Sequence, residues 1–234
     1  MYIDLSGVWK IQLHTDLGFQ EGDIRLPGVL QAQGFGNEIT YKTPWVSGLH
    51  DPYWWEREEY QYAQEEGTKV SFLAQPPKHY LGKALYKREF EIEEEINDTW
   101  YLYIELTHWR SKVWIDEQEM GEDCSLCTAH RIECGYMTKG KHIVEVEIDN
   151  AMQYPYRPDG HGVSDALGAT WNGMVGELAL ITESKLLERD LQKWIYAKEH
   201  ARHIEVKDGK FYVGESKHEI FGCANGIVRR MLLQ

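Results

Sequence analysis

Four cysteines are the residues of this 234-residue chain with the clearest capacity for chemistry. Cys124 and Cys127 form a CxxC pair, and Cys134 and His130 follow within ten residues, a conceivable arrangement for zinc. The pair does not open a helix after a strand, as a thioredoxin-like redox pair would. We therefore expect Cys124, Cys127, Cys134 and Cys223 to be reduced structural thiols, with a zinc site as the alternative. No cofactor and no resident metal are predicted.

Carboxylates are abundant, since the chain contains 38 Asp and Glu residues, but their placement predicts no catalytic pair. Most lie on the polar faces of predicted strands or in charge runs such as the glutamates at positions 93–95. Acid–base catalysis needs positioned carboxyl groups at one site, and no two of these residues fall in a predicted cleft. We therefore expect no catalytic residues in this chain.

The charge and the hydrophobic pattern exclude several classes of partner. Subtracting 38 acidic from 25 basic residues gives a net charge of −13, and the basic residues form no cluster, so nucleic acid is not an expected partner. No apolar run approaches the ~20 residues that cross a bilayer, so a membrane is not an expected partner either. The first ten residues lack a secretory signal, which favours a cytoplasmic location.

Aromatic residues are the most informative part of the composition, with nine Trp and fourteen Tyr. They fill the cores of β-sandwiches, and they also form flat apolar platforms for the C–H faces of pyranose rings. Trp45, Trp54 and Trp55 fall in predicted loops, where stacking on a ligand is one interpretation. Packing under the loop, against the body of the domain, is the alternative.

Residues 100–106 are the clearest of the elements that must position such groups. Their side chains alternate with period two, which predicts a strand with one face in a core. Residues 112–116 alternate in the same way, so we expect the two strands to pair as antiparallel neighbours. His108 and Arg110 are then solvated turn residues, and residues 117–121 form the next turn with a glycine that permits positive φ.

Strand periodicity recurs along the first 183 residues and predicts an all-β fold. The other predicted strands span residues 8–13, 84–92, 130–133, 142–149 and 171–181. Gly173 and Gly176 are predicted kinks or bulges in the last of them. Long irregular loops occupy residues 31–50 and 150–170.

Six segments occur in an order and spacing that resembles a known family: DLSGVWKIQL, RLPGVLQAQGFG, ALYKREFEI, SKVWIDEQEMG, KHIVEVEIDN and WNGMVGELALI. Together they resemble the sugar-binding domain of glycoside hydrolase family 2, which includes β-galactosidases, β-glucuronidases and β-mannosidases. The resemblance covers residues 1–183 and implies a galactose-binding-domain-like jelly-roll β-sandwich, in agreement with the predicted strands. We expect this sandwich over residues 1–184 and a short C-terminal appendage over residues 185–234.

The appendage resembles the region through which family members enter their catalytic domain. Residues 185–203 are charged and are expected to connect, and residues 202–220 predict a hairpin about Asp208 and Gly209. In the family a (β/α)8 barrel follows, whose two carboxylates act as acid/base and nucleophile. The match stops after Phe221. We therefore expect a truncated or interrupted hydrolase whose missing partner is the catalytic barrel, and no turnover by this chain alone.

The resemblance also implies a site on the sandwich, built from two loops that reach the active-site rim. Asn37 resembles a family asparagine there, and its amide both donates and accepts hydrogen bonds, as a sugar hydroxyl requires. Asp165 is the acid nearest a family aspartate that contacts sugar or an ion, although its spacing to the next strand differs. His161 and Asp159 share that long loop, and Trp45 is a predicted stacking residue. The alternatives are an asparagine that satisfies its own loop backbone and a solvated, flexible loop.

The sequence thus predicts a non-catalytic carbohydrate-binding or scaffold domain of a family 2-like glycoside hydrolase, with weak affinity for β-glycoside-type sugars. A free-standing carbohydrate-binding module and a purely structural scaffold without sugar contacts are the alternatives. The sequence specifies neither the sugar and its linkage nor the oligomeric state.

Overall fold

The computed structural model describes residues 1–43, 56–59, 61, 76–154, 170–200, 204–207, 210–213 and 216–218. The chain divides into two compact units, Met1–Glu183 and Ser184–Gln234, which are taken in turn below. No helix in the described part is both long enough and apolar enough to span a membrane.

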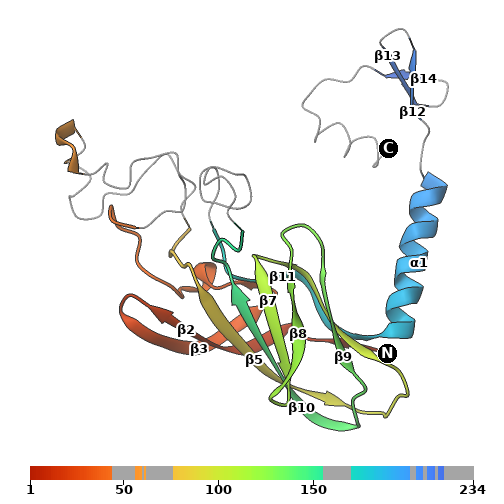
Figure 1. Ribbon diagram of the computed structural model, residues 1–234, viewed down its shortest axis with the longest axis horizontal. Helices are drawn as coiled ribbons and strands as arrows, with labels where there is room; N and C mark the ends of the chain where they lie inside the picture. Colours follow the sequence, from red (N-terminus) through yellow and green to blue (C-terminus); the bar gives the residue numbers. More distant parts are fainter. Residues whose placement is uncertain are drawn as a thin grey trace. The chain divides into compact units, whose positions relative to one another are not determined.

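The first unit is a sandwich of two antiparallel β-sheets, which confirms the predicted all-β fold (Figure 1). One sheet contains, in order, β1 (Tyr2–Asp4), β11 (Gly173–Thr182), β6 (Trp100–Thr107) and β9 (His130–Gly135), and the short strand β4 (Gly28–Val29) also pairs with β11. The other contains, in order, β3 (Gly18–Leu26), β2 (Gly7–Thr15), β5 (Lys83–Ile92), β10 (Gly140–Asp149), β7 (Arg110–Ile115) and β8 (Gln118–Cys124). A single 3-10 turn, η1 (Gln31–Gln33), follows β4.

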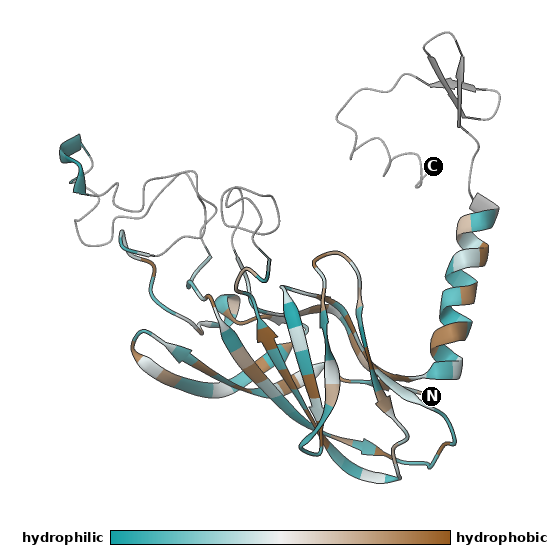
Figure 2. Cartoon of the chain, in the orientation of Figure 1, coloured by the Kyte–Doolittle hydropathy of each residue, from teal (hydrophilic) through white to brown (hydrophobic). Residues whose placement is uncertain are grey.

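Alternation of apolar and polar side chains builds this architecture, and Figure 2 shows it as alternating colours along the strands. Six alternate side chains of the strands predicted over residues 100–106, 112–116 and 142–149 are all at most 3% exposed: Leu102, Ile104, Val113, Ile115, Val144 and Val146. Fully burying one such side chain is favourable by about 1.5–3 kcal/mol. The three strands that carry them are therefore held by the same apolar core.

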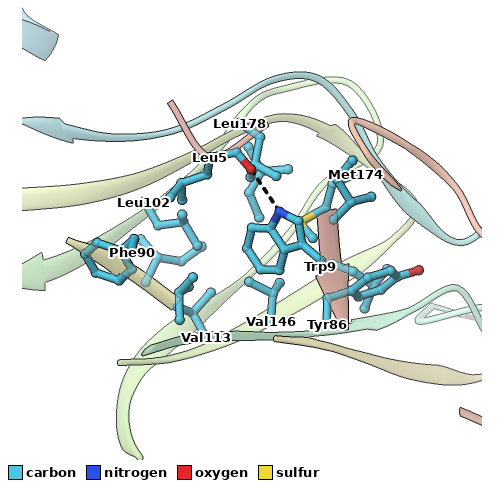
Figure 3. Packing of buried hydrophobic residues seen from close by; sticks show 14 of the residues in the cluster. Leu5, Trp9, Tyr86, Phe90, Leu102, Val113, Val146, Met174 and Leu178 are labelled. Atoms are coloured by element: carbon cyan, nitrogen blue, oxygen red, sulfur yellow. Dashed lines mark hydrogen bonds between the residues drawn. The ribbon is translucent and has the colours of Figure 1, made fainter. Parts of the chain in front are cut away.

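The core lies between the two sheets and includes large aromatic residues (Figure 3). Trp9 of β2 is 1% exposed and donates its indole Nε1–H to the Leu5 carbonyl oxygen at 2.8 Å. Figure 3 shows this bond among Leu178, Met174 and Val146. Because its polar atom has a partner, this indole adds a large apolar area to the core without an unsatisfied donor.

Strands β6 and β7 are consecutive in sequence but belong to different sheets, so the predicted antiparallel pairing between them is wrong. β6 pairs with β9 and β11, whereas β7 pairs with β8 and β10. His108 and Trp109 therefore carry the chain from one sheet to the other. Period-two alternation identifies a strand and its buried face but not its partner, so an arch between sheets and a hairpin look alike in sequence.

The turn after β7 is shorter than predicted. Asp116 and Glu117 form it, with φ of 49° and 69°, and they connect β7 to β8. Two positive φ values are typical of a type I′ turn, whose twist matches that of the flanking strands. Gly121, predicted to lie in this turn, instead lies within β8 opposite Val113, at a shift in the pairing register.

Strand β11 carries the predicted irregularity close to its start. Its pairing with β6 shifts between Val175 and Leu178, and Gly176 within this bulge has φ of 74°. At Gly173 the backbone of β4 comes so close that a Cβ atom would lie 2.3 Å from the Gly28 carbonyl oxygen. A glycine at position 173 therefore permits β4 to pair with β11.

The second unit contains most of helix α1 (Glu183–His200) and a three-stranded antiparallel sheet of β12 (Ile204–Lys207), β13 (Lys210–Val213) and β14 (Ser216–His218). The expected connection over residues 185–203 is thus a helix for most of its length. Leu187, Leu191 and Ile195 recur every four residues among strong helix formers, a pattern hidden by the surrounding charges. β12 and β13 pair on either side of the predicted hairpin position, while the residues at its tip lie outside the described part.

Candidate functional site

Buried amide side chains hold the segments together where β10 ends and β11 begins. Asn172 is 0% exposed and donates from Nδ2 to the carbonyl oxygens of Gly82 and Ile148, both at 3.0 Å. Its Oδ1 accepts the hydroxyl of Tyr86 at 2.8 Å, and burial raises the pKa of that hydroxyl well above its usual value. Asn150, 2% exposed, accepts the Gly82 N–H at 2.8 Å. The cluster is neutral, and it ties β5, β10 and β11 to one another.

Gln31 connects this cluster to the segment that follows β4. Its side chain is 1% exposed, with Nε2 donating to the Thr170 carbonyl oxygen at 3.2 Å and Oε1 accepting the Asn172 N–H at 3.1 Å. The backbone N–H of Leu30 also donates to the Asn172 carbonyl oxygen at 2.9 Å. The start of the loop after β4 and the end of the loop before β11 are therefore joined at their bases.

An apolar pocket of about 450 Å³ borders these joined segments. Its lining comes from β4, η1, β6, β11 and the residues just before β5 and β11: Val29, Gln31, Ala32, Pro76, Pro77, Leu106, Thr170, Trp171 and Val175. This volume falls within the range of small-molecule sites, which are mostly apolar with a few polar groups. A small molecule would therefore fit in this pocket.

Four ring side chains run in a row from the wall of this pocket. The ring centroids lie 5.6 Å apart for Trp171 and His108, 6.0 Å for His108 and Trp109, and 6.1 Å for Trp109 and Tyr154. His108 is 6% exposed, so its prediction as a solvated turn residue is wrong, because the crossing between sheets takes it into the end of the sandwich. Arg110 is partly exposed and pairs with a carboxylate of β8.

Asn37 is the predicted site residue that the described part of the chain contains, and its amide is partly engaged. Its Oδ1 accepts the backbone N–H of Asp16 at 2.9 Å, and its backbone exchanges two hydrogen bonds with His79. This is the backbone-satisfying role considered as the alternative for Asn37, and among the described residues Nδ2 makes no hydrogen bond. The other predicted site residues, Trp45, Asp159, His161 and Asp165, lie outside the described residues, as do Trp54 and Trp55.

The cysteine-containing region is built around a buried histidine. His130 is 0% exposed, and its Nδ1 lies 2.6 Å from the Ser111 hydroxyl oxygen. Burial raises the pKa of the Cys134 thiol to about 12, and Cys124 and Cys127 are also thiols. Within the described ranges, no three His, Cys, Asp or Glu side chains are grouped so as to hold a metal ion.

Many carboxylates of the described strands form ion pairs on outward faces. Between β5 and β10, for example, Lys87 pairs with Glu145 at 3.0 Å. Hydrogen bonds from Ser6 and Arg110 lower the pKa of Asp4 and Glu122, respectively. A glycosidase general acid needs a raised pKa, so neither of these two carboxyl groups fits that role.

The amide cluster was not predicted from the sequence, because its members lie far apart in the chain. Gln31, Asn150 and Asn172 come from three segments with no common spacing. A positional signal was present, since Asn150 directly follows the strand predicted over residues 142–149 and Asn172 is the second residue of the strand predicted over residues 171–181. Amides at strand ends are suited to satisfying the backbone groups that the strands leave unpaired.

Comparison with known proteins gives no match to a family model and none to a curated protein. Among solved structures, the chain is similar to an FMN-binding β-glucuronidase from Facaelibacterium prausnitzii L2-6, with 12% identity, a TM-score of 0.49, and 78% of this chain and 22% of that chain covered. It is similar to a GH2 β-galacturonidase from Eisenbergiella tayi, with 18% identity and a TM-score of 0.41. That match covers 77% of this chain and 24% of the galacturonidase chain. It is also similar to a β-glucuronidase from Ruminococcus gnavus, with 16% identity and a TM-score of 0.48. That match covers 78% of this chain and 29% of the glucuronidase chain. The chain thus spans less than a third of each of these glycosidases.

Proposed function

We propose that residues 1–183 are the sugar-binding β-sandwich domain of a glycoside hydrolase similar to family 2. In this role the domain is non-catalytic and contributes carbohydrate contacts beside a catalytic barrel. The six sequence segments that resemble the family support the assignment, and all of them belong to one sandwich, five on its strands and one mostly on β4 and η1.

The observation that carries the proposal is the connection between the bases of two loops. Gln31 bonds to Thr170 at 3.2 Å and to the N–H of Asn172 at 3.1 Å. The segment leading to Asn37 and the segment that ends the loop of Asp165 therefore start from the same end of the sandwich. Two polar loops at one end form half of a sugar site, which a second domain would complete.

Half a site predicts weak binding, because few hydrogen bonds must offset the cost of association. We expect methyl β-D-glucuronide, methyl β-D-galactoside or methyl β-D-mannoside to shift amide NMR resonances near Asn37 first, with a Kd of about 1 mM. Asn37→Ala should weaken this binding severalfold. The control is Asn97→Ala, which removes an exposed amide just before the start of β6. The pocket residue Leu106 lies near the opposite end of that strand.

Two other outcomes would replace the proposal. Micromolar binding unaffected by Asn37→Ala and Asp165→Ala would identify a free-standing binding module with its site elsewhere. If none of the three glycosides shifts any amide resonance, the domain is a structural scaffold without sugar contacts. Release of nitrophenol from nitrophenyl β-glycosides that persists through repurification would contradict the non-catalytic role, since that chemistry needs two carboxyl groups facing one sugar site.

A further inference from the structure

The apolar pocket beside Gln31 differs in chemistry from a sugar site. Its walls include Val29, Leu106 and Val175, and two consecutive prolines, Pro76 and Pro77, close one side. Proline has a fixed φ and no N–H, so this side offers a stiff wall without backbone donors. The walls of the pocket therefore offer apolar contact and few partners for hydroxyl groups.

The one side-chain amide among the described residues that line the pocket is already used by the protein. Gln31 is 1% exposed, and both ends of its amide are bonded, to the Thr170 carbonyl oxygen and to the Asn172 N–H. A pyranose placed here would lose hydration of its hydroxyl groups without gaining these partners, which is unfavourable. An apolar ligand would lose nothing of this kind.

The size and the wall chemistry favour a flat ring. An apolar protein cavity of about 150 Å³ already binds benzene, and the pocket, at about 450 Å³, has room for a bicyclic ring system. Trp171 lines the pocket, and its indole packs against the His108 ring with 5.6 Å between the ring centroids. Aromatic ligands pack well against such a surface.

We infer that this pocket binds the planar, apolar aglycone of an aryl β-glycoside, next to the proposed sugar contacts of the Asn37 loop. The inference rests on the proposed function for the identity of the attached sugar. It adds the substrate class, since a glycoside with an aromatic leaving group would engage both surfaces and one with a small alkyl group would engage only the rim.

Three compounds test this on the full chain: 4-methylumbelliferone, methyl β-D-glucuronide and 4-methylumbelliferyl β-D-glucuronide. Free 4-methylumbelliferone should shift the methyl NMR resonances of Val29, Leu106 and Val175. The aryl glucuronide should bind about tenfold more tightly than the methyl glucuronide, because burial of one ring adds apolar contact. Equal affinities, or ring-induced shifts confined to other residues, would overturn the inference.

A substitution that fills the pocket sharpens the test. Ala32 lines the pocket from η1 but is itself exposed, so Ala32→Phe adds a ring there without disturbing the core. It should abolish the tenfold preference while keeping the thermal unfolding midpoint of the wild type. Val8→Phe, at a 53% exposed position on β2, is the matched control and should keep the preference. An unchanged preference in Ala32→Phe would overturn the inference.

The two proposals fail separately in these measurements. If the methyl glucuronide shifts the Asn37 loop but 4-methylumbelliferone leaves the pocket unchanged, the aglycone site is wrong and the proposed function stands. If 4-methylumbelliferone binds in the pocket but no methyl glycoside shifts any loop, the ring site stands and the proposed sugar-binding function is wrong.

Discussion

The two ends of strand β10 are joined to their neighbours by opposite chemistry. At its start, His142 and Asp116 form an ion pair with 2.6 Å between Nδ1 and Oδ2, and the Asp116 side chain is 49% exposed. Past its other end, roughly 30 Å away, the buried amides of Asn150 and Asn172 make neutral hydrogen bonds. Charge is used where water reaches it, and amides are used where it does not.

The charged end depends on the protonation of one ring. Both nitrogens of His142 face acceptors, the Asp116 carboxylate at 2.6 Å and the Thr138 carbonyl oxygen at 2.8 Å, and the ring stacks on Phe90. Burial opposes the charged imidazole, but the hydrogen bonds to Asp116 and Thr138 outweigh it, so the pKa of His142 is raised. The amide end has no such dependence, so the two ends should respond differently to mutation and to pH.

The largest loss of folding stability is expected from Asn172→Ala at the amide end. The change leaves the Tyr86 hydroxyl and the carbonyl oxygens of Gly82 and Ile148 without this partner in a buried site. We expect the free energy of unfolding to fall by about 4 kcal/mol, measured by urea denaturation. The exposed Asn97→Ala should change it by less than about 0.5 kcal/mol. A loss below about 1 kcal/mol for Asn172→Ala would show that the cluster is not structural.

Glycine substitutions compare crowding at the two ends. A Cβ at Gly173 would lie 2.3 Å from the Gly28 carbonyl oxygen, whereas one at Gly140 would meet nothing within 4 Å, and φ is positive at both positions. Gly173→Ala should therefore cost about 3 kcal/mol, from strain and steric overlap together, and Gly140→Ala only about 1 kcal/mol from strain. Similar losses for both variants in denaturation would remove the steric part of this argument.

A single hydroxyl tests how strongly the amide cluster is coupled. Tyr86→Phe removes the donor to Asn172 at 2.8 Å and leaves Oδ1 of the amide without it. The expected loss is about 1–2 kcal/mol. Combined with Asn172→Ala, the total loss should be smaller than the sum of the two, because both remove the same bond. Strict additivity in this double-mutant cycle would contradict the coupling.

The smallest effect, and the one that depends on pH, is expected at His142. Its pKa is raised on folding from 6.5, so its contribution is present below that value and is lost as pH rises through the folded pKa. Desolvation opposes ionisation of Asp116, but bonds from His142 and the Ile143 N–H outweigh it and lower its pKa from 3.8, so its contribution is lost as pH falls through the folded value.

The stability difference between wild type and His142→Gln should therefore be greatest between about pH 4 and pH 6.5, at about 0.5 kcal/mol. Unfolding titrations across this pH range provide the measurement. In the same range, the difference between wild type and Tyr86→Phe should stay constant, because the pKa of Tyr86 lies well above 10. A difference for His142→Gln that grows toward alkaline pH would contradict the assignment.

Sequence periodicity predicted seven strands of the sandwich, because in each of them the alternation of buried and exposed side chains is a local property of the segment. It missed β1, β3 and β4, and it predicted a turn over most of β8. Leu102 and Val146 lie in the core as expected. Sheet membership was beyond this reasoning, because β6 and β7 take their partners from β11 and β10, which lie further along the chain. The helix was missed because its apolar residues are few among many charges.

The candidate site was predictable only in part for a similar reason. Asn37 was identified by resemblance, but whether its amide serves a ligand or the backbone depends on Asp16, 21 residues away. The pocket and the amide cluster exist only because distant segments converge in the fold. No local spacing relates Gln31 to Asn172, so folding had to bring them together before their chemistry could be recognised.

Strand β11 also determines when the sandwich can close during protein synthesis. It is the central partner of both β1 and β6, and Tyr2 pairs with Ile181. A ribosome adds about 5–20 residues per second, so β1 leaves the tunnel about 10 to 40 s before its partner does. Strand β6 leaves only about 4 to 15 s before β11, because Ile104 and its partner Leu178 are 74 residues apart. In that shorter interval the edge of β6 that β11 will cover is unpaired, and a chaperone that shields exposed strand edges would act on the nascent chain then.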